Sequence, residues 1–190
     1  MEAHVQALYE GRAQELVWLL EHPPLYTAGP LTQEGHILDL QRCPTYITDR
    51  GGQATYHGPG QRVAYVMLDL RRRQMDVRWY VHQLEQWLID TLAEFNIQAE
   101  RKKGRVGLWV TDGLQEAKIA AIGVKIRKWI TFHGIALNIS PDLSYFQGIV
   151  PCGLHHYGVT SMQALGFKGS MQEVDELLRP NFERLFSCSL

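Results

Sequence analysis

Hydrophobic and polar positions along this chain change repeatedly between strand-like runs and helical spacing. An apolar run between Glu15 and Glu21 ends at two prolines and predicts a buried strand. Further β-rich runs lie on either side of a glycine-dense segment and after a long helical segment. The predicted strands cover residues 15–21, 45–48, 62–68, 105–111, 118–128 and 130–138.

Helical spacing is clearest after Asp76, a residue type that suits a helix N-cap. Apolar side chains recur every three or four positions from Val77 to Phe95. Residues 3–9 predict a short first helix and residues 174–186 a last one. Because Pro180 lies inside the last pattern, we expect a kink or two shorter helices there. The elements predict one α/β (α+β) domain over residues 1–190, with a mixed or mostly antiparallel sheet flanked by helices.

Composition narrows the possible partners. The chain has 190 residues, with 19 Lys and Arg against 20 Asp and Glu, so it lacks the basic field typical of nucleic-acid binding. No apolar run approaches the ~18 residues of a membrane span. The first residues show no basic and apolar export signal. The odd number of cysteines, three, suits a reducing compartment. We therefore expect a cytoplasmic protein with neither nucleic-acid nor membrane partners.

The most unusual segment is the glycine-rich stretch 50–61, which holds four glycines and one proline in twelve residues. Such a backbone forms tight turns and allows close approach of a ligand to the main chain. A solvated hairpin loop is the ordinary interpretation of a glycine-rich segment. The length of this one, and the tyrosine and histidine between its glycines, favour a substrate cradle.

Cys152 lies between Pro151 and Gly153, in a predicted rigid turn. A nucleophile with backbone N–H groups aimed at a developing oxyanion would suit this context. A small buried side chain is an equally good interpretation, because free cysteines are commonly buried. Cys43 and Cys188 lie in a loop and at a helix end, and we expect both to be inert.

A catalytic thiol at position 152 would need activation. A free thiol, with a pKa of ~8.5, is only about 3% thiolate at pH 7. Lowering that pKa to ~6.5 takes about 2.7 kcal/mol. One ammonium at ~4 Å and an effective dielectric constant near 20 supplies about 4 kcal/mol before desolvation. Lys118 is the candidate because it opens the apolar run 118–124, although an ordinary strand-edge charge is the alternative.

Metal binding has weak support. Cys152, His155 and His156 lie close together, but zinc sites usually contain three or four ligands in recognisable pairs. We expect no metal.

The chain has two basic clusters, at 71–73 and 101–105. Such clusters are most often solvated faces, and steering of an acidic protein partner is the alternative.

Taken together, the motifs resemble those of the octanoyltransferases, or lipoyl(octanoyl) transferases, of lipoic-acid biosynthesis. The similarity covers most of the chain, and the motifs follow the order of that family. Ala54 stands where the family more often has valine, and the N-terminus is somewhat shorter than the family pattern. The segments that carry the resemblance are 21–29, 50–61 with Tyr65 and 69–70, 104–109, 118–123, 133–138, 151–153 and 158–161.

The resemblance implies the fold of lipoate- and biotin-protein ligases and an acyltransferase that needs no cofactor. The implied reaction moves an octanoyl group from octanoyl-acyl carrier protein to a lysine of lipoyl domains. Those domains belong to 2-oxoacid dehydrogenase complexes and to the glycine cleavage H protein. Cys152 would carry the acyl thioester, and Lys118 would lower its pKa and transfer protons. The implied substrate-contacting residues are Arg50, Gly51, Gly52, Gln53, Ala54, Thr55, Tyr56, His57, Ala121, Ile122, Gly123, Gly134, Ile135 and Ala136.

Overall fold

A computed structural model of the chain describes residues 1–112, 115–150 and 157–187. Within these residues the larger sheet has seven strands, mostly antiparallel, and the smaller sheet has three. The larger sheet runs in the order β1 (Leu16–Leu20), β5 (Gln61–Met67), β9 (Ile130–Asn138), β8 (Gln115–Arg127), β7 (Arg105–Asp112) and β6 (Glu100–Lys102), and β10 (Gly158–Val159) joins β8 in parallel. The smaller sheet runs in the order β3 (Thr45–Ile47), β2 (Leu25–Ala28) and β4 (Thr55–His57). The mixed sheet expected from the sequence is confirmed.

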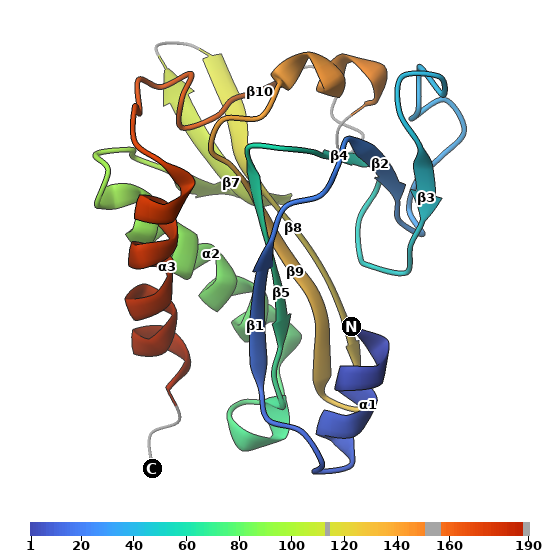
Figure 1. Cartoon of the computed structure of the whole chain (residues 1–190), viewed down its shortest axis with the longest axis vertical. Coiled ribbons are helices and arrows are strands. Elements are labelled where there is room, and N and C mark those ends of the chain that lie inside the picture. The colour runs from blue at the N-terminus through green and yellow to red at the C-terminus, as the bar shows by residue number, and fades with distance from the viewer. Residues whose placement is uncertain (113–114, 151–156, 188–190) are drawn as a thin grey trace.

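The helices and the smaller sheet form layers on the two faces of the larger sheet. Helices α2 (Val77–Ala93) and α3 (Met171–Phe186) cover one face, whereas α1 (Glu2–Tyr9) and the three-stranded sheet cover the other (Figure 1). Of two short 3₁₀ helices, η1 (Leu70–Arg72) lies between β5 and α2, and η2 (Leu143–Gly148) lies between β9 and β10. The main hydrophobic core lies between the larger sheet and the pair α2 and α3, and includes Val66, Leu84, Trp87, Leu137 and Leu178.

Helix α2 begins where the sequence predicts. The Asp76 carboxylate accepts hydrogen bonds from the backbone N–H groups of Arg78 at 2.7 Å and Trp79 at 3.1 Å. These groups have no partner within the helix, and the side chain therefore satisfies donors that would otherwise depend on water. The helix ends at Ala93, so it is slightly shorter than the apolar pattern that reaches Phe95.

Replacing Asp76 with alanine is expected to lower the free energy of unfolding by about 1 kcal/mol, the usual cost of losing an N-cap side chain. Urea denaturation followed by circular dichroism measures this. The control is Gln74→Ala, an exposed position two residues earlier, which should change stability by less than about 0.5 kcal/mol. Equal stability of the two variants would contradict the capping role.

Helix α3 is continuous across Pro180, so the alternative of two shorter helices is wrong. Contacts on both sides of the proline hold the helix in place. The Trp87 indole N–H on α2 donates to the Leu178 carbonyl at 2.7 Å, and the Asn181 amide donates to the Thr91 hydroxyl on α2 at 3.4 Å. Tertiary packing therefore outweighs the local cost of proline, which is about 3 kcal/mol in a helix interior.

The expectation of a buried strand at 15–21 is wrong in its burial. β1 lies at the edge of the sheet and pairs with β5. Val17 and Leu19 pack against the main core, whereas the alternate side chains Leu16 and Trp18 are 39% and 47% exposed. An apolar run indicates a strand but does not distinguish a central strand from an edge strand.

Some side chains of the basic clusters are paired within the molecule, whereas Arg72 and Lys103 are exposed, so the expectation of solvated faces holds only in part. Arg73 binds the Glu15 carboxylate at 2.5 Å, and Arg101 binds Glu85 at 2.9 Å. Within the second cluster, Arg105 binds Glu116 at 2.7 Å. These arginines tie loops and strands to neighbouring elements.

Candidate active site

A glycine-containing loop between β3 and β4, residues 48–54, lies over the larger sheet. The Gly51 N–H donates to the Val124 carbonyl on β8 at 2.9 Å. A Cβ at position 51 would stand 2.9 Å from that same carbonyl oxygen, and Gly52 has a φ of +95°. Glycine at these two positions therefore lets the loop contact the sheet backbone directly.

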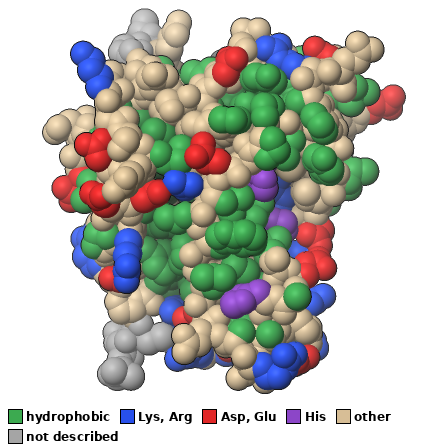
Figure 2. Space-filling model, in the orientation of Figure 1, with side chains coloured by type: hydrophobic (Ala, Val, Ile, Leu, Met, Phe, Trp, Pro, Cys, Tyr) green, Lys and Arg blue, Asp and Glu red, His purple; other side chains and the backbone are tan. Residues whose placement is uncertain are grey.

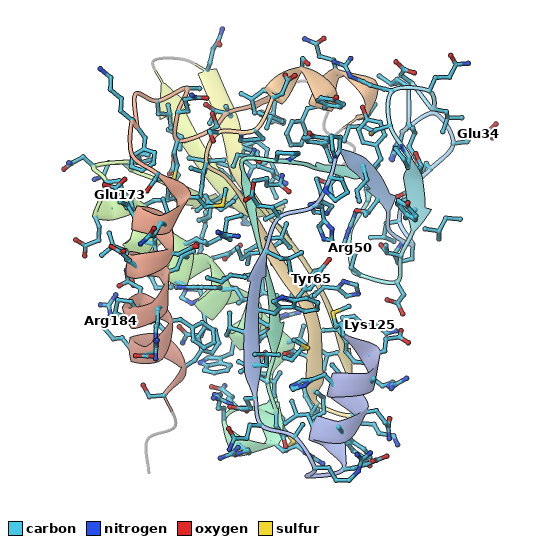
Figure 3. The ribbon with its side chains drawn as sticks, in the orientation of Figure 1. Glu34, Arg50, Tyr65, Lys125, Glu173 and Arg184 are labelled. Carbon is cyan, nitrogen blue, oxygen red and sulfur yellow. The ribbon has the colours of Figure 1, made fainter. Side chains whose placement is uncertain are left out.

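Arg50 holds this loop in shape. Its guanidinium donates to the Thr27 carbonyl at 2.9 Å, the Gln53 carbonyl at 2.7 Å and the Gly51 carbonyl at 3.1 Å. The Thr27 hydroxyl accepts two further bonds, and Arg50 is only 8% exposed. In Figure 3 its side chain lies between the smaller sheet and Tyr65 on β5. The principal contacts of this charge therefore organise the loop backbone.

Replacing Arg50 with methionine is expected to lower the free energy of unfolding by about 3 kcal/mol, because buried carbonyl groups lose charged donors. Arg50→Lys should recover little of this loss, since a single ammonium cannot reproduce the planar fork. Guanidinium denaturation measures both variants. Arg127→Met, at an exposed position, serves as the control. A loss below about 0.5 kcal/mol for Arg50→Met would contradict the assignment.

The loop and the sheet enclose a pocket of about 100 Å³. Strand register places small side chains on its floor, with Ala121 and Ala136 side by side and Gly123 opposite Gly134. The face of the molecule in Figure 2 shows hydrophobic side chains across its middle, with histidines beside them. The residues that line the pocket are Thr27, Thr48, Arg50, Gly51, Gly52, Gln53, Thr55, His57, Val63, Tyr65, Ala121, Ile122, Gly123, His133, Gly134, Ile135 and Ala136.

Two of the expected contact residues, Ala54 and Tyr56, do not line this pocket. Both are almost fully buried in a separate core cluster, where Tyr56 stacks on Tyr145 with ring centroids 4.8 Å apart. Side chains alternate along β4, so Thr55 and His57 line the pocket and Tyr56 points to the opposite side. The other twelve residues expected from the resemblance surround the pocket.

Lys118 is buried on β8, at 7% exposure. Its Nζ donates to the Val106 carbonyl at 2.9 Å and lies 5.1 Å from the centroid of the Trp109 ring. Lys118 also lines a small cavity that shares Thr55, Ala121 and Ala136 with the main pocket. The expectation that the apolar run draws this lysine inward is therefore confirmed. The small cavity beside Lys118 therefore adjoins the main pocket, since three residues line both.

The candidate nucleophile Cys152 lies outside the described residues, as do His155, His156 and Cys188. Cys43 lies in the second core cluster, and desolvation raises the pKa of its thiol above the ordinary value. In the described part of the chain no group of three or more histidine, cysteine, aspartate or glutamate side chains could hold a metal ion.

His57 forms one wall of the pocket as a neutral imidazole. Desolvation lowers its pKa to about 4. Its Nδ1 lies 2.7 Å from the Gln61 side-chain oxygen, and the Gln61 amide donates to the Asn138 side chain at 2.9 Å. This chain of hydrogen bonds fixes the ring next to the Lys118 cavity, which Gln61 and Asn138 also line.

The opposite end of the pocket carries a polar cluster. The Asp49 carboxylate pairs with Lys125, and its other oxygen lies 3.2 Å from Nε2 of His133. The hydrogen bond from Lys125 lowers the pKa of Asp49, while desolvation lowers the pKa of His133. Lys125 lies beside α1 in Figure 3. The cluster thus links the loop to strands β8 and β9.

Sequence reasoning missed Thr27, Thr48, Val63, Tyr65 and His133 as pocket residues. Val63 and Tyr65 pair with Ala136 and Gly134 across β5 and β9. The alternation of β5 could have placed Val63 and Tyr65 on one face, but their position over the pocket depends on strand register.

Among the described residues, no helix has the length and apolar character needed to cross a membrane.

Comparison with known sequences identifies close relatives. The family described as the lipoyl protein ligase A/B catalytic domain matches residues 1–183. An octanoyltransferase of Parvibaculum lavamentivorans is 60% identical over 190 residues, covering 98% of this chain and 84% of that protein. An octanoyltransferase of Paramagnetospirillum magneticum is 59% identical over 189 residues, covering 99% of this chain and 89% of that protein.

Solved structures agree in fold. A bipartite lipoate protein ligase from Thermoplasma acidophilum, studied with its E2 lipoyl domain, has a TM-score of 0.74 at 17% identity and covers 96% of this chain and 76% of its own. A lipoate-protein ligase A bound with ATP has a TM-score of 0.73 at 18% identity. The similarity covers 96% of this chain and 78% of that one. Because the family match extends over nearly the whole chain and close relatives share more than half of its residues, this chain belongs to the lipoyl protein ligase A/B catalytic-domain family and, within it, to the octanoyltransferases of lipoic-acid biosynthesis.

Proposed function

We propose that this chain is an acyltransferase that moves an octanoyl group from octanoyl-acyl carrier protein to a lysine of lipoyl domains, through a thioester on Cys152. The observation that carries the proposal is that buried Lys118 lines a small cavity which shares Thr55, Ala121 and Ala136 with the main pocket. This arrangement occurs in a chain 60% identical to an octanoyltransferase. A narrow floor of alanine and glycine suits an unbranched acyl chain.

In the first step, the Cys152 thiolate attacks the carbonyl carbon of the octanoyl thioester. A new carbon–sulfur bond forms, and the bond to the carrier sulfur breaks as the tetrahedral adduct collapses. The carrier thiolate leaves with a proton from the Lys118 ammonium. One thioester replaces another of similar energy, so this step needs no nucleotide.

In the second step, the neutral amine of the acceptor lysine attacks the acyl-enzyme. An amide bond forms, the bond to the Cys152 sulfur breaks, and Lys118 accepts the proton that the amine loses. Lys118 thereby regains its charge and Cys152 its thiolate. Enclosure of the acyl chain between the loop and the sheet would limit hydrolysis of the thioester by water.

The acceptors in this proposal are the lipoyl domains of 2-oxoacid dehydrogenase complexes and the glycine cleavage H protein. Support comes from the fold shared with a lipoate protein ligase that was studied with its E2 lipoyl domain. We propose that the chain acts in the cytoplasm, without a resident cofactor or metal and without nucleic-acid or membrane partners.

The test mixes the purified chain with octanoyl-acyl carrier protein and an isolated lipoyl domain in the absence of ATP. Intact-protein mass spectrometry should find one octanoyl group on the lipoyl domain and, without acceptor, one on the enzyme. Two other outcomes point to other functions. Transfer that requires ATP and free octanoate would indicate a ligase, whereas carrier binding without any transfer would indicate a non-catalytic binding module.

A further inference from the structure

We propose that His133, together with Tyr65, forms the far end of the acyl pocket and sets the longest acyl chain that the enzyme accepts. The inference rests on the proposed function, because it assigns the occupant of the pocket as a fatty acyl chain. It adds a specificity-determining role for His133, which sequence reasoning did not place among the contact residues.

His133 is held against the pocket by contacts on several sides. Its ring lies edge-on to that of Tyr65, with centroids 6.0 Å apart, and the Asp49 carboxylate fixes its Nε2. Its backbone N–H donates to the Met1 sulfur at 3.2 Å. Lys125 binds the same Asp49 carboxylate, so the whole cluster is tied to both strands.

The backbone at His133 is also unusual. Its φ of +57° is in the left-handed region of backbone conformation, which residues other than glycine rarely adopt. The His133 ring lies on the pocket side of β9, edge-on to Tyr65, which also lines the pocket. Strained conformations of this kind occur often at functional sites. The strain turns an imidazole toward the pocket in the middle of β9.

Beyond His133 the same face of the sheet is filled. A separate core cluster joins Val5 and Leu8 of α1 to Met67, Ile130 and Phe132. The pocket therefore ends between the aromatic pair of Tyr65 and His133 and this packed cluster. An acyl chain that extends past His133 would have to displace side chains of a closed core.

The dimensions fit an eight-carbon chain. From Ala136 to His133 the strand advances three residues, about 10 Å at ~3.3 Å per residue. An extended chain advances ~3.3–3.6 Å for every three bonds, so the seven carbon–carbon bonds of an octanoyl group span about 8 Å. An acyl carbonyl held near Ala136, which lines both the Lys118 cavity and the pocket, would place its terminal methyl at Tyr65 and His133.

The experiment compares kcat/KM for decanoyl- and octanoyl-acyl carrier protein, with a lipoyl domain as acceptor. His133→Gly removes the ring and suits the positive φ, and it should raise the decanoyl-to-octanoyl ratio about tenfold, the lower range for one or two methylenes in an apolar pocket. His133→Asn, which tolerates the same backbone and leaves a smaller side chain at the end of the pocket, should raise the ratio less than His133→Gly. Asn96→Gly, at an exposed residue with a similar φ of +59°, is the control for added glycine.

A ratio within twofold of the original in His133→Gly, with octanoyl transfer retained, would overturn the inference. Absence of octanoyl transfer by the unmodified chain would instead overturn the proposed function. A second measurement needs no variant: an octanoyl thioester with a terminal diazirine, loaded on the carrier, should label peptides containing Tyr65 or His133 on illumination. Labelling confined to other peptides would contradict the assignment even if His133→Gly fails to fold.

Discussion

Replacement of Cys152 by alanine is expected to abolish the acyl-enzyme and to reduce octanoyl transfer to the lipoyl domain on the order of 10⁴-fold or more, as loss of a covalent nucleophile does in other enzymes. Without the sulfur, the carrier thioester has no group on the enzyme to which the acyl chain can move. The acceptor amine would then have to attack the carrier thioester directly. Intact-protein mass spectrometry measures the adduct, and transfer to the lipoyl domain is followed in the same way.

The matched control for this prediction is Cys43→Ala. Cys43 is buried among aromatic side chains, and its raised thiol pKa disfavours the thiolate. Iodoacetamide at neutral pH should therefore modify Cys152 quickly and Cys43 very slowly in the folded protein. An octanoyl adduct at full level in Cys152→Ala, or its loss in Cys43→Ala, would refute the nucleophile assignment.

The long elements of the fold could be predicted from the sequence because their patterns are local. Asp76 and the apolar spacing after it define α2, and the runs that become β8 and β9 lie next to each other in the chain. Whether a strand lies at the edge of a sheet depends on distant parts of the chain. For this reason the prediction that β1 is buried was wrong. Pro180 was misjudged for a similar reason, since the contacts that keep α3 whole come from α2.

The candidate site could be predicted where the backbone conformation requires a particular residue type. Gly51 and Gly52 are needed for contact between loop and sheet, and their pattern is visible in the sequence. Arg50 was expected to contact substrate, but the hydrogen bonds to its own loop became evident only in three dimensions. His133 could not be identified because a positive φ inside a β-rich run leaves no sequence pattern. The meeting of Lys118 and Cys152 stays a prediction.

Replacement of Lys118 by methionine is expected to reduce transfer about 10²- to 10⁴-fold, the usual contribution of one general acid and base. Methionine is close to lysine in length and apolar, so it can fill the same buried position beside Trp109. Two effects combine in this loss. In the proposed mechanism the thiol loses the ammonium that favours its thiolate, and the leaving carrier sulfur loses its proton donor.

The ionisation of Cys152 separates these two effects. Iodoacetamide modification is measured from pH 5 to 10, and in Lys118→Met the pH of half-maximal rate should rise toward the ordinary thiol pKa of ~8.5. The sign follows from charge: a neighbouring cation favours the thiolate, so its removal favours the protonated thiol. Lys168→Met, an exposed lysine, is the control and should leave the profile unchanged. An unshifted profile in Lys118→Met would contradict the electrostatic role of Lys118, and a transfer rate above one tenth of the original would contradict its role in proton transfer.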